Sequence, residues 1–329
     1  MLSRTADHLF WYSRYTERAE NTARLLDVNH QGALLPQSED QVTKGWHSLL
    51  SISELSRAYA ARHGEIDAAR VQAFIVADEH NPSSIYNCLR AARENARAVR
   101  GTLTTETWET TNQTWLEFNR QLKGGALARD PGGLFEWVKL RAHLSRGVLA
   151  GTMLHDEAMD FLRLGSFLER ADNTARLLDV KFHALEGDPN ETHAEQDVER
   201  EAAREAQRDP ARDFYHWSAV LRSVSGFEIY RKVYSNVIQP DKVAELLIVN
   251  NQLPRSLAYC MGRMVRSLEQ VANAESAETL RQAGRLAAEL RYARVDEIIA
   301  GGLHSFLNQF LERVAKIGDG ISRSFLLPA

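Results

Sequence analysis

The sequence predicts an all-α protein, an internally duplicated helical bundle with two pseudo-symmetric halves of about 150 residues each. Apolar residues recur at helical spacing along most of the chain, and no segment alternates as a strand would between turn dipeptides. The stretch at 17–28 is repeated at 169–180 with one conservative change, Glu20 against Asp172. Shorter segments recur in the same order farther along both halves, which extends the repeat beyond this one stretch.

Composition excludes several classes of function. The chain has 329 residues and a net charge of −4, so it presents no basic field for nucleic acid. No apolar run approaches the ~20 residues of a membrane helix, and the N-terminus lacks the apolar core of a signal peptide. We therefore expect a cytoplasmic protein without a membrane segment. Cys88 and Cys260 form no disulfide framework and are expected as buried structural thiols.

The repeat sets the expected domain organisation. We predict a first helical repeat at 1–151 and a second at 152–329, together forming one compact unit. Pro82–Cys88 in the first half is matched by Pro254–Cys260 in the second. The offset between matched segments grows by about 20 residues, which places an acidic insertion at about 186–213 that is expected to be solvated, partly helical or disordered.

The helices of the first half each have a sequence reason for their bounds. Gly32 closes a long amphipathic helix, and Ser38 opens the next with the capping-box pattern Ser-Glu-Asp-Gln. Asn81-Pro82 offers an N-cap and a first-turn proline, and Gly124-Gly125 ends a later helix. The expected spans are 3–31, 38–62, 65–77, 82–99, 105–122 and 136–148.

The second half is expected to follow the same order. Asp209-Pro210 supplies another N-cap and first-turn pair, and Gly318 marks a break in the last helix. Gly132-Gly133 and Gly301-Gly302 are expected as loops and not as phosphate-binding turns, because no strand precedes either pair. The expected spans are 155–185, 210–224, 241–250, 254–272, 277–293 and 302–323.

The repeated stretch carries polar residues in a defined geometry. On a helical wheel Glu17, Asn21 and Arg24 share one stripe, and Glu169, Asn173 and Arg176 repeat it. Arg18 and Arg170 fall on the apolar arc, where an unpaired charge would be very costly. We therefore expect the two copies to pack face to face about a pseudo-twofold axis. In that packing Arg18 binds Glu169 through two hydrogen bonds, and Arg170 binds Glu17 in the same way.

Two hypotheses for this stretch stay open at the level of sequence. In the first it is a structural clasp, since Glu20 with Arg24 and Asp172 with Arg176 are ordinary ion pairs at i,i+4 spacing. In the second it lines a polar pocket between the halves that takes an anionic or amide ligand. One observation speaks for the second: the polar positions are repeated as faithfully as the apolar ones, whereas packing alone tolerates many swaps. The ligand-binding candidates are Arg18, Asn21, Arg24, Arg170, Asn173 and Arg176.

The sequence contains no pattern that is typical of a metal site or of a catalytic triad. A carboxylate-bridged two-metal centre needs a histidine three residues after its glutamate, and none follows Glu17 or Glu169 at that spacing. We therefore expect no metal site. His143 and His304 are single histidines on amphipathic helices and are expected to be packing residues. The cofactor, if any, is not specified by the residues.

The chain resembles the bacterial alpha-E family, a group of helical domains of unknown function. The two copies of the Glu-Arg-Ala-[Glu/Asp]-Asn-Thr-Ala-Arg-Leu-Leu-Asp-Val stretch carry most of the resemblance. His155 departs from it, since the family more often has an arginine before Asp-Glu. Further matching segments, which together cover nearly the whole chain, include Asn81–Ile85, Arg93–Arg97, Phe135–Lys139, Arg146-Gly147, Thr152-Met153, Pro254–Leu257 and Gly302–His304.

The resemblance implies partners more than an activity. Such proteins accompany a circularly permuted ATP-grasp ligase, and often a transglutaminase-like protease, in systems thought to make or modify peptides through amide bonds. It also implies that Glu17, Arg18, Glu169 and Arg170 are functional. The expected function is a helical accessory protein of the ligase. The alternative is an enzyme acting on the peptide product, with Glu17 or Glu169 as general base and therefore with a raised pKa.

Overall fold

The described part of the chain consists of helices and the loops that connect them. A computed structural model describes residues 1–34, 38–186, 210–234 and 237–326, and no β-strand occurs among them. Most of the expected acidic insertion lies outside these residues. The first eight helices are α1 (Ser3–Ala33), α2 (Glu39–Ile52), α3 (Ser56–His63), α4 (Ala68–Val76), α5 (Ile85–Ala98), α6 (Thr105–Lys123), α7 (Ala126–Arg129) and α8 (Pro131–Thr152).

The remaining helices follow in the second half of the chain. A 3-10 turn at Ala274–Ser276 leads into α15, and it is capped by Asn273, whose side chain accepts hydrogen bonds from two backbone N–H groups. The helices are α9 (Glu157–Glu186), α11 (Pro210–Ser223), α12 (Phe227–Tyr234), α13 (Pro240–Ile248), α14 (Leu257–Val271), α15 (Ala277–Tyr292), α16 (Val295–Ala300) and α17 (Leu303–Phe325). The all-α prediction is confirmed for the described residues.

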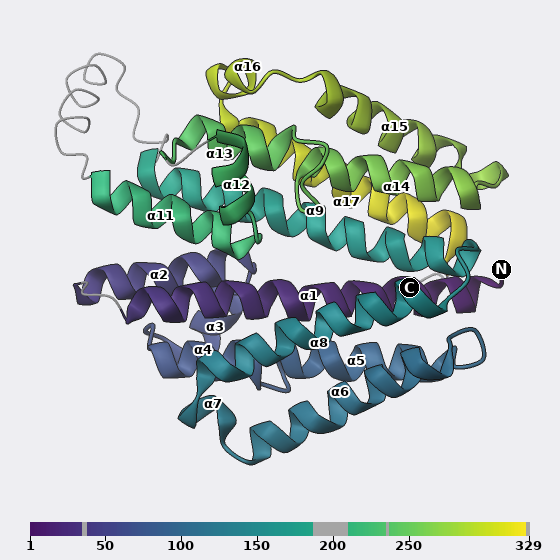
Figure 1. Cartoon of the computed structure of the whole chain (residues 1–329), viewed down its shortest axis with the longest axis horizontal. Coiled ribbons are helices and arrows are strands. Elements are labelled where there is room, and N and C mark those ends of the chain that lie inside the picture. Colours follow the sequence, from purple (N-terminus) through teal and green to yellow (C-terminus); the bar gives the residue numbers. More distant parts are fainter. Residues whose placement is uncertain (35–37, 187–209, 235–236, 327–329) are drawn as a thin grey trace.

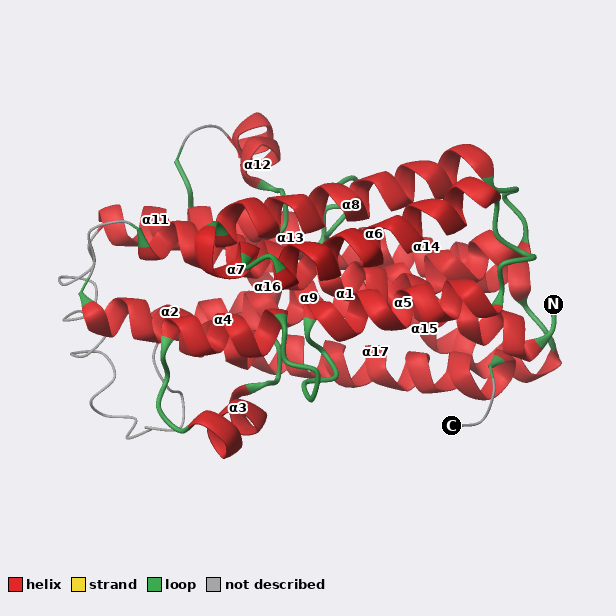
Figure 2. Ribbon diagram, turned by 90° about the horizontal axis from the view of Figure 1, so that it is seen from below, coloured by secondary structure: helices red, strands yellow, loops and turns green. Residues whose placement is uncertain are grey.

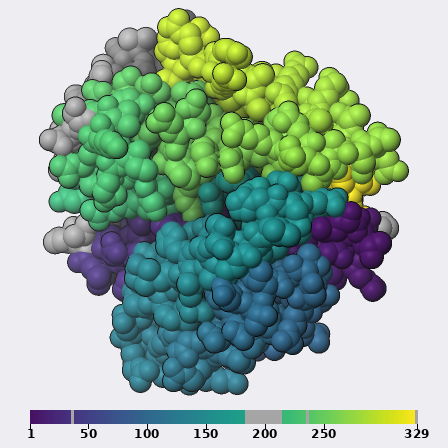
Figure 3. Space-filling model, turned by 45° about the vertical axis from the view of Figure 1, so that its right-hand side comes forward, coloured from purple at the N-terminus to yellow at the C-terminus, as the bar shows by residue number. Residues whose placement is uncertain are grey.

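The two long helices α1 and α9 pack side by side at the centre of the bundle (Figure 1). On one side α1 packs against α5 and α8, and on the other α9 packs against α14 and α17. Figure 2 shows most long helices running along the same axis, with the short α3 and α12 at the periphery. The space-filling view separates the first half of the chain from the second along a single boundary (Figure 3). The face-to-face packing expected of the repeated stretch is present, whereas the internal duplication and the domain division stay predictions.

A glycine sets how closely the two central helices approach. A Cβ atom built on Gly165 of α9 would overlap the carbonyl of Phe10 and the hydroxyl of Ser13 on α1. Only hydrogen fits at this contact, so the backbone of α9 lies directly against the Phe10 carbonyl and the Ser13 side chain of α1, just before the repeated stretch. Gly318 is likewise packed against Leu168 of α9, at 3.2 Å from a built Cβ. The break expected at Gly318 is absent, because α17 runs through it as one helix.

Several expected bounds are wrong for identifiable reasons. The helix expected at 38–62 is divided, because Glu54 has φ +56° and ends α2. Asn81 does not cap α5: its side chain accepts from the N–H of Ser83, and Ser84 is the N-cap instead. Gly132-Gly133 lies inside the first turn of α8, which Asp130 caps by accepting from the N–H of Gly133 at 2.9 Å. The capping box at Ser38 is confirmed.

Candidate functional site

The two copies of the repeated stretch form reciprocal ion pairs across the α1–α9 contact. Arg18 donates from Nε and Nη2 to the two carboxylate oxygens of Glu169, at 2.5 and 2.9 Å. Arg170 donates in the same way to Glu17, at 2.9 and 2.8 Å. Both glutamates are buried. The two bidentate pairs predicted from helical spacing are confirmed.

Each pair belongs to a larger cluster, and we call the one around Glu17 the first centre. Arg255, in the turn before α14, lies between the carboxylates of this centre. Its Nη1 is 3.1 Å from Glu17 and 2.6 Å from Oδ1 of Asn21, and its Nη2 is 2.8 Å from Glu20. Arg146 of α8 contacts both glutamates. The first centre comprises Glu17, Glu20, Asn21, Arg24, Arg146, Arg170 and Arg255.

Arginines lower the pKa of both carboxylates in the first centre. Burial alone would raise the pKa of Glu17, but Arg170 and Arg255 outweigh burial and lower it. Burial would also raise the pKa of Glu20, yet Arg255, Arg146 and Arg24 hold it well below its ordinary value. Both carboxylates are therefore ionised and fully paired. The pairing of both carboxylates is what the structural-clasp hypothesis expects of this centre.

The second centre is built around Glu169 and has fewer arginines per carboxylate. Arg14 and Arg18 both bind Glu169 and lower its pKa against the effect of burial. Asp172 is paired with Arg176 at 2.7 Å, but there burial outweighs the arginine, so the pKa of Asp172 is raised. The second centre comprises Arg14, Arg18, Glu169, Asp172, Asn173 and Arg176.

Two loops close over these centres with the same unusual backbone. Glu54 after α2 and Ser225 after α11 are the described non-glycine residues with positive φ, at +56° and +54°. Each occupies the position after a helix end that normally requires glycine, with the N–H of the following residue bonded back into the last turn. Glu54 binds Nη1 of Arg176 at 2.5 Å, and Ser225 accepts from Nη1 of Arg24 at 2.6 Å. Each loop therefore contacts an arginine of the repeated stretch, at the cost of some backbone strain.

A pocket of about 170 Å³ opens at the second centre, between α1, α9 and the loop after α2. Asn21 is 3 % exposed and its Nδ2 has no hydrogen-bond partner, although it lines this pocket. Arg24 and Arg170 do not reach it and belong to the first centre. Five of the eight candidate site residues line the pocket: Arg18, Asn21, Glu169, Asn173 and Arg176.

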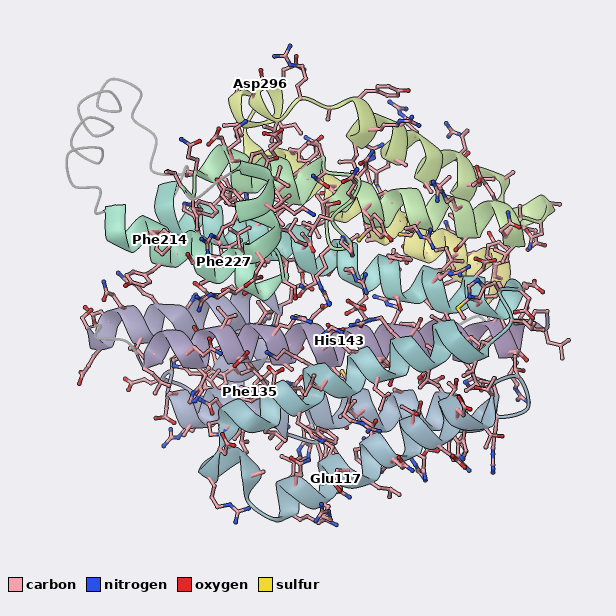
Figure 4. The ribbon with its side chains drawn as sticks, viewed as in Figure 1. Glu117, Phe135, His143, Phe214, Phe227 and Asp296 are labelled. Carbon is pink, nitrogen blue, oxygen red and sulfur yellow. The ribbon has the colours of Figure 1, made fainter. Side chains whose placement is uncertain are left out.

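Sequence reasoning missed part of the site. His143 was expected to be a packing residue, but its two ring nitrogens lie 3.0 Å from Arg24 and 2.8 Å from Arg146. Figure 4 places His143 on α8 where that helix passes α1. His304 is also polar, since its Nδ1 lies 2.6 Å from Asp179. Arg146 and Arg255 lie in segments that match the family resemblance, which was the available signal for both.

The two cysteines are buried, as expected. Burial raises the pKa of both Cys88 and Cys260 to about 12, so both thiols are protonated at neutral pH. Within the described residues, no group of three or more His, Cys, Asp or Glu side chains is arranged to hold a metal ion. None of the helices described is both long and apolar enough to cross a membrane.

Comparison with known proteins places this architecture in a family. Residues 1–326 match Alpha-E, described as a predicted alpha-helical domain with a conserved ER motif. The chain belongs to the Alpha-E family. The Glu17-Arg18 and Glu169-Arg170 pairs that bind each other across α1 and α9 fit that description. The function of the Alpha-E domain is not known.

Similar proteins from mycobacteria are larger than this chain. Uncharacterized proteins of Mycobacterium bovis and Mycobacterium tuberculosis are 24 % and 23–24 % identical to it over 334 residues. The matches cover 94 % of this chain but 35 % of those proteins, so the chain spans about a third of their length. No solved structure matches the chain.

Proposed function

We propose that this Alpha-E protein is a helical accessory protein of an ATP-grasp amide ligase, and that its second centre holds a polar group of the peptide being made or modified. The partner follows from the family resemblance, which also makes a transglutaminase-like protease a second partner. One observation supports the pocket most directly: Asn21 lines it, and the buried Nδ2 of this side chain has no hydrogen-bond partner. A buried donor left unpaired is costly, and a bound acceptor would remove that cost.

Each of the two sequence hypotheses is supported at a different centre. The two carboxylates of the first centre are fully paired, which supports the structural clasp. The second has a cavity, which supports ligand binding. Of the two ligand groups suggested by the sequence, an anion has little support, because Arg18 and Arg176 are already bound by carboxylates. An amide remains compatible with the free donor of Asn21.

The structure does not support Glu17 or Glu169 as the general base of the enzyme alternative. That alternative required Glu17 or Glu169 with a raised pKa, but the pKa of each is lowered by its arginines. Asp172 is the pocket carboxylate with a raised pKa, which makes it the candidate general base of this alternative. An activity of the chain alone on a peptide, lost in Asp172→Asn, would support this alternative.

Reconstitution tests the accessory function. The full chain is mixed with its cognate ATP-grasp protein, and amide product and ADP are followed with and without the chain. We expect faster product formation with the wild-type chain, and loss of that effect in Asn173→Leu, which changes the pocket. Arg129→Gln, which lies away from both centres, should act as wild type. Equal turnover with and without the chain would refute the proposal.

A further inference from the structure

The first centre contains the guanidinium group of Arg255, and the second centre has no corresponding group. We propose that the pocket of the second centre binds the guanidinium group of a ligand at the corresponding position. The ligand class is an arginine residue or arginine derivative. This inference deepens the proposed function by naming the polar group that the pocket holds. It rests on a comparison of two residues, Ser83 and Arg255.

Ser83 and Arg255 hold corresponding positions in the fold. Each directly precedes the serine that caps a helix: Ser84 caps α5, and Ser256 caps α14. Both helices pack against a central helix, α5 on α1 and α14 on α9. The turn before each helix therefore reaches the opposite copy of the repeated stretch. Ser83 lines the pocket beside Glu169, and Arg255 contacts Glu17.

The side chain of Arg255 fills the first centre. It is 6 % exposed, and its guanidinium binds Glu17, Glu20 and Oδ1 of Asn21. The short side chain of Ser83 cannot do this in the second centre. The pocket of about 170 Å³ lies beside Ser83. It is lined by Glu169, Asp172 and Asn173, which correspond to the three residues that Arg255 binds, Glu17, Glu20 and Asn21.

The charges of the two centres differ by one arginine. Glu20 binds three arginines, Arg24, Arg146 and Arg255. The corresponding Asp172 has only Arg176 as an ion-pair partner among the described residues. The raised pKa of Asp172 agrees with this shortage, because burial is its largest cause and Arg176 and Arg14 together do not offset it. A second guanidinium would supply Asp172 with the partner that Glu20 already has.

Hydrogen bonds favour a guanidinium over other groups. Within the described residues the side-chain amide of Asn173 makes no hydrogen bond, whereas Oδ1 of the corresponding Asn21 accepts from Arg255. A planar fork of N–H donors reaches several acceptors at once, as Arg255 does, and an ammonium is less suited to this. The free Nδ2 of Asn21 is a donor, so it fits the carbonyl oxygen of an arginine derivative. The side chain of Glu54 is 68 % exposed, which leaves a path from solvent to the pocket.

Calorimetric titration of the full chain tests the ligand class. Four blocked amino acids serve as probes: N-acetyl-arginine amide, N-acetyl-lysine amide, N-acetyl-glutamine amide and N-acetyl-glutamate amide. We expect the arginine probe to bind at least about tenfold more tightly than the other three. Equal or tighter binding of the glutamine or glutamate probe, or no binding of the arginine probe, would overturn the inference.

Substitutions locate the binding. Ser83→Arg should fill the pocket as Arg255 fills the first centre, abolish binding of the arginine probe and keep or raise the melting temperature. Thr43→Arg, exposed on α2 and outside the pocket, is the matched control and should bind normally. Arg255→Ser should lower the melting temperature and be partly rescued by millimolar methylguanidinium. The rise in melting temperature should exceed the one that the same ligand gives wild type through the pocket of the second centre. Unchanged binding in Ser83→Arg would contradict the site even if Arg255→Ser fails to fold.

The outcome can be separated from that of the proposed function. If the chain stimulates the ligase but does not bind the arginine probe, the guanidinium inference fails and the accessory function stands. If the probe binds and Ser83→Arg abolishes this, but the ligase turns over equally without the chain, the accessory function fails and the guanidinium site stands.

Discussion

The guanidinium of Arg170 and the carboxylate of Glu17 are joined by two hydrogen bonds of 2.9 and 2.8 Å, and both side chains are almost fully buried. This pair connects α9 to α1 at the centre of the bundle. Its net contribution to stability is modest, because both charges lose their hydration. Removal of one partner is a different matter, since the other charge then stays buried without compensation.

We therefore expect Glu17→Gln to lower the free energy of unfolding by about 3–5 kcal/mol, since Glu17 contacts Arg170, Arg255 and Arg146. Glu169→Gln should cost less, because its partners Arg14 and Arg18 keep 20 % and 26 % of their side-chain surface in solvent. Urea unfolding followed by circular dichroism measures both. The reverse order would contradict the burial argument.

Glu20 has more arginine partners than the corresponding Asp172, and this difference gives a second prediction. Glu20→Gln leaves three arginines without their shared carboxylate and should cost several kcal/mol. Asp172→Asn removes a carboxylate that burial already disfavours, and Arg176 keeps Glu54 as a partner. It should change the free energy of unfolding by no more than about 1 kcal/mol. A large loss in Asp172→Asn would show that its pairing is stronger than the raised pKa indicates.

Close approach of the central helices gives a third prediction. Gly165→Ala places a Cβ against Phe10 and Ser13 and should cost about 1–3 kcal/mol through displacement of α9 from α1. The matched control is Gly147→Ala on α8, where a Cβ meets nothing within 4 Å. That substitution should leave stability unchanged or raise it by about 0.5–1 kcal/mol, because alanine favours helix. Thermal unfolding of the two variants side by side distinguishes a packing effect from a general glycine effect.

The pairing of the central helices was predictable because it depends on local periodicity and on one energetic rule. Helical spacing places Arg18 and Arg170 on the buried arc, and a buried arginine must find a carboxylate. With two stretches that differ at one position, the reciprocal partners Glu169 and Glu17 follow. The hydrogen bonds bear this out, and the helix bounds of α1 and α9 lie within two residues of those expected.

The rest of the site depends on contacts that no local pattern specifies. Arg146 and Arg255 come from α8 and from the turn before α14, and only tertiary packing brings them to Glu17 and Glu20. The break at Glu54 has no glycine or proline to announce it. Asn81 lies three residues before Ser84, and both are good N-caps, so the sequence alone does not rank them.

Acid should unfold the protein through its buried glutamates. The folded-state pKa values of Glu17, Glu20 and Glu169 lie below the ordinary value of about 4.3, so the unfolded chain takes up protons first as pH falls. Their stabilisation is therefore complete above about pH 5 and is lost as pH falls below about 4. Melting temperatures between pH 7 and pH 3 measure this loss. Glu20→Gln should show a shallower fall over the same window, and an equally steep fall would contradict the assignment.

The buried amine of Lys181 should make the protein more stable as pH rises in the alkaline range. Lys181 lines an apolar cavity of about 110 Å³ near the ends of α1 and α9, and burial lowers its pKa to about 8. No described residue pairs with its amine. Below pH 8 the amine is protonated in both the folded and unfolded states, and the folded state bears the whole cost of burying the charge. Lys181→Met should therefore raise the melting temperature at pH 7.

That gain should shrink as pH rises from 8 toward about 10.4, because the folded wild-type protein loses its proton before the unfolded chain does. Lys44→Met, on the exposed face of α2, is the control and should leave the pH dependence unchanged. Melting curves of the three proteins at pH 7, 8.5 and 10 measure the effect. A gain in Lys181→Met that grows with pH, or a loss of stability at pH 7, would show that the amine has a charged partner in solution.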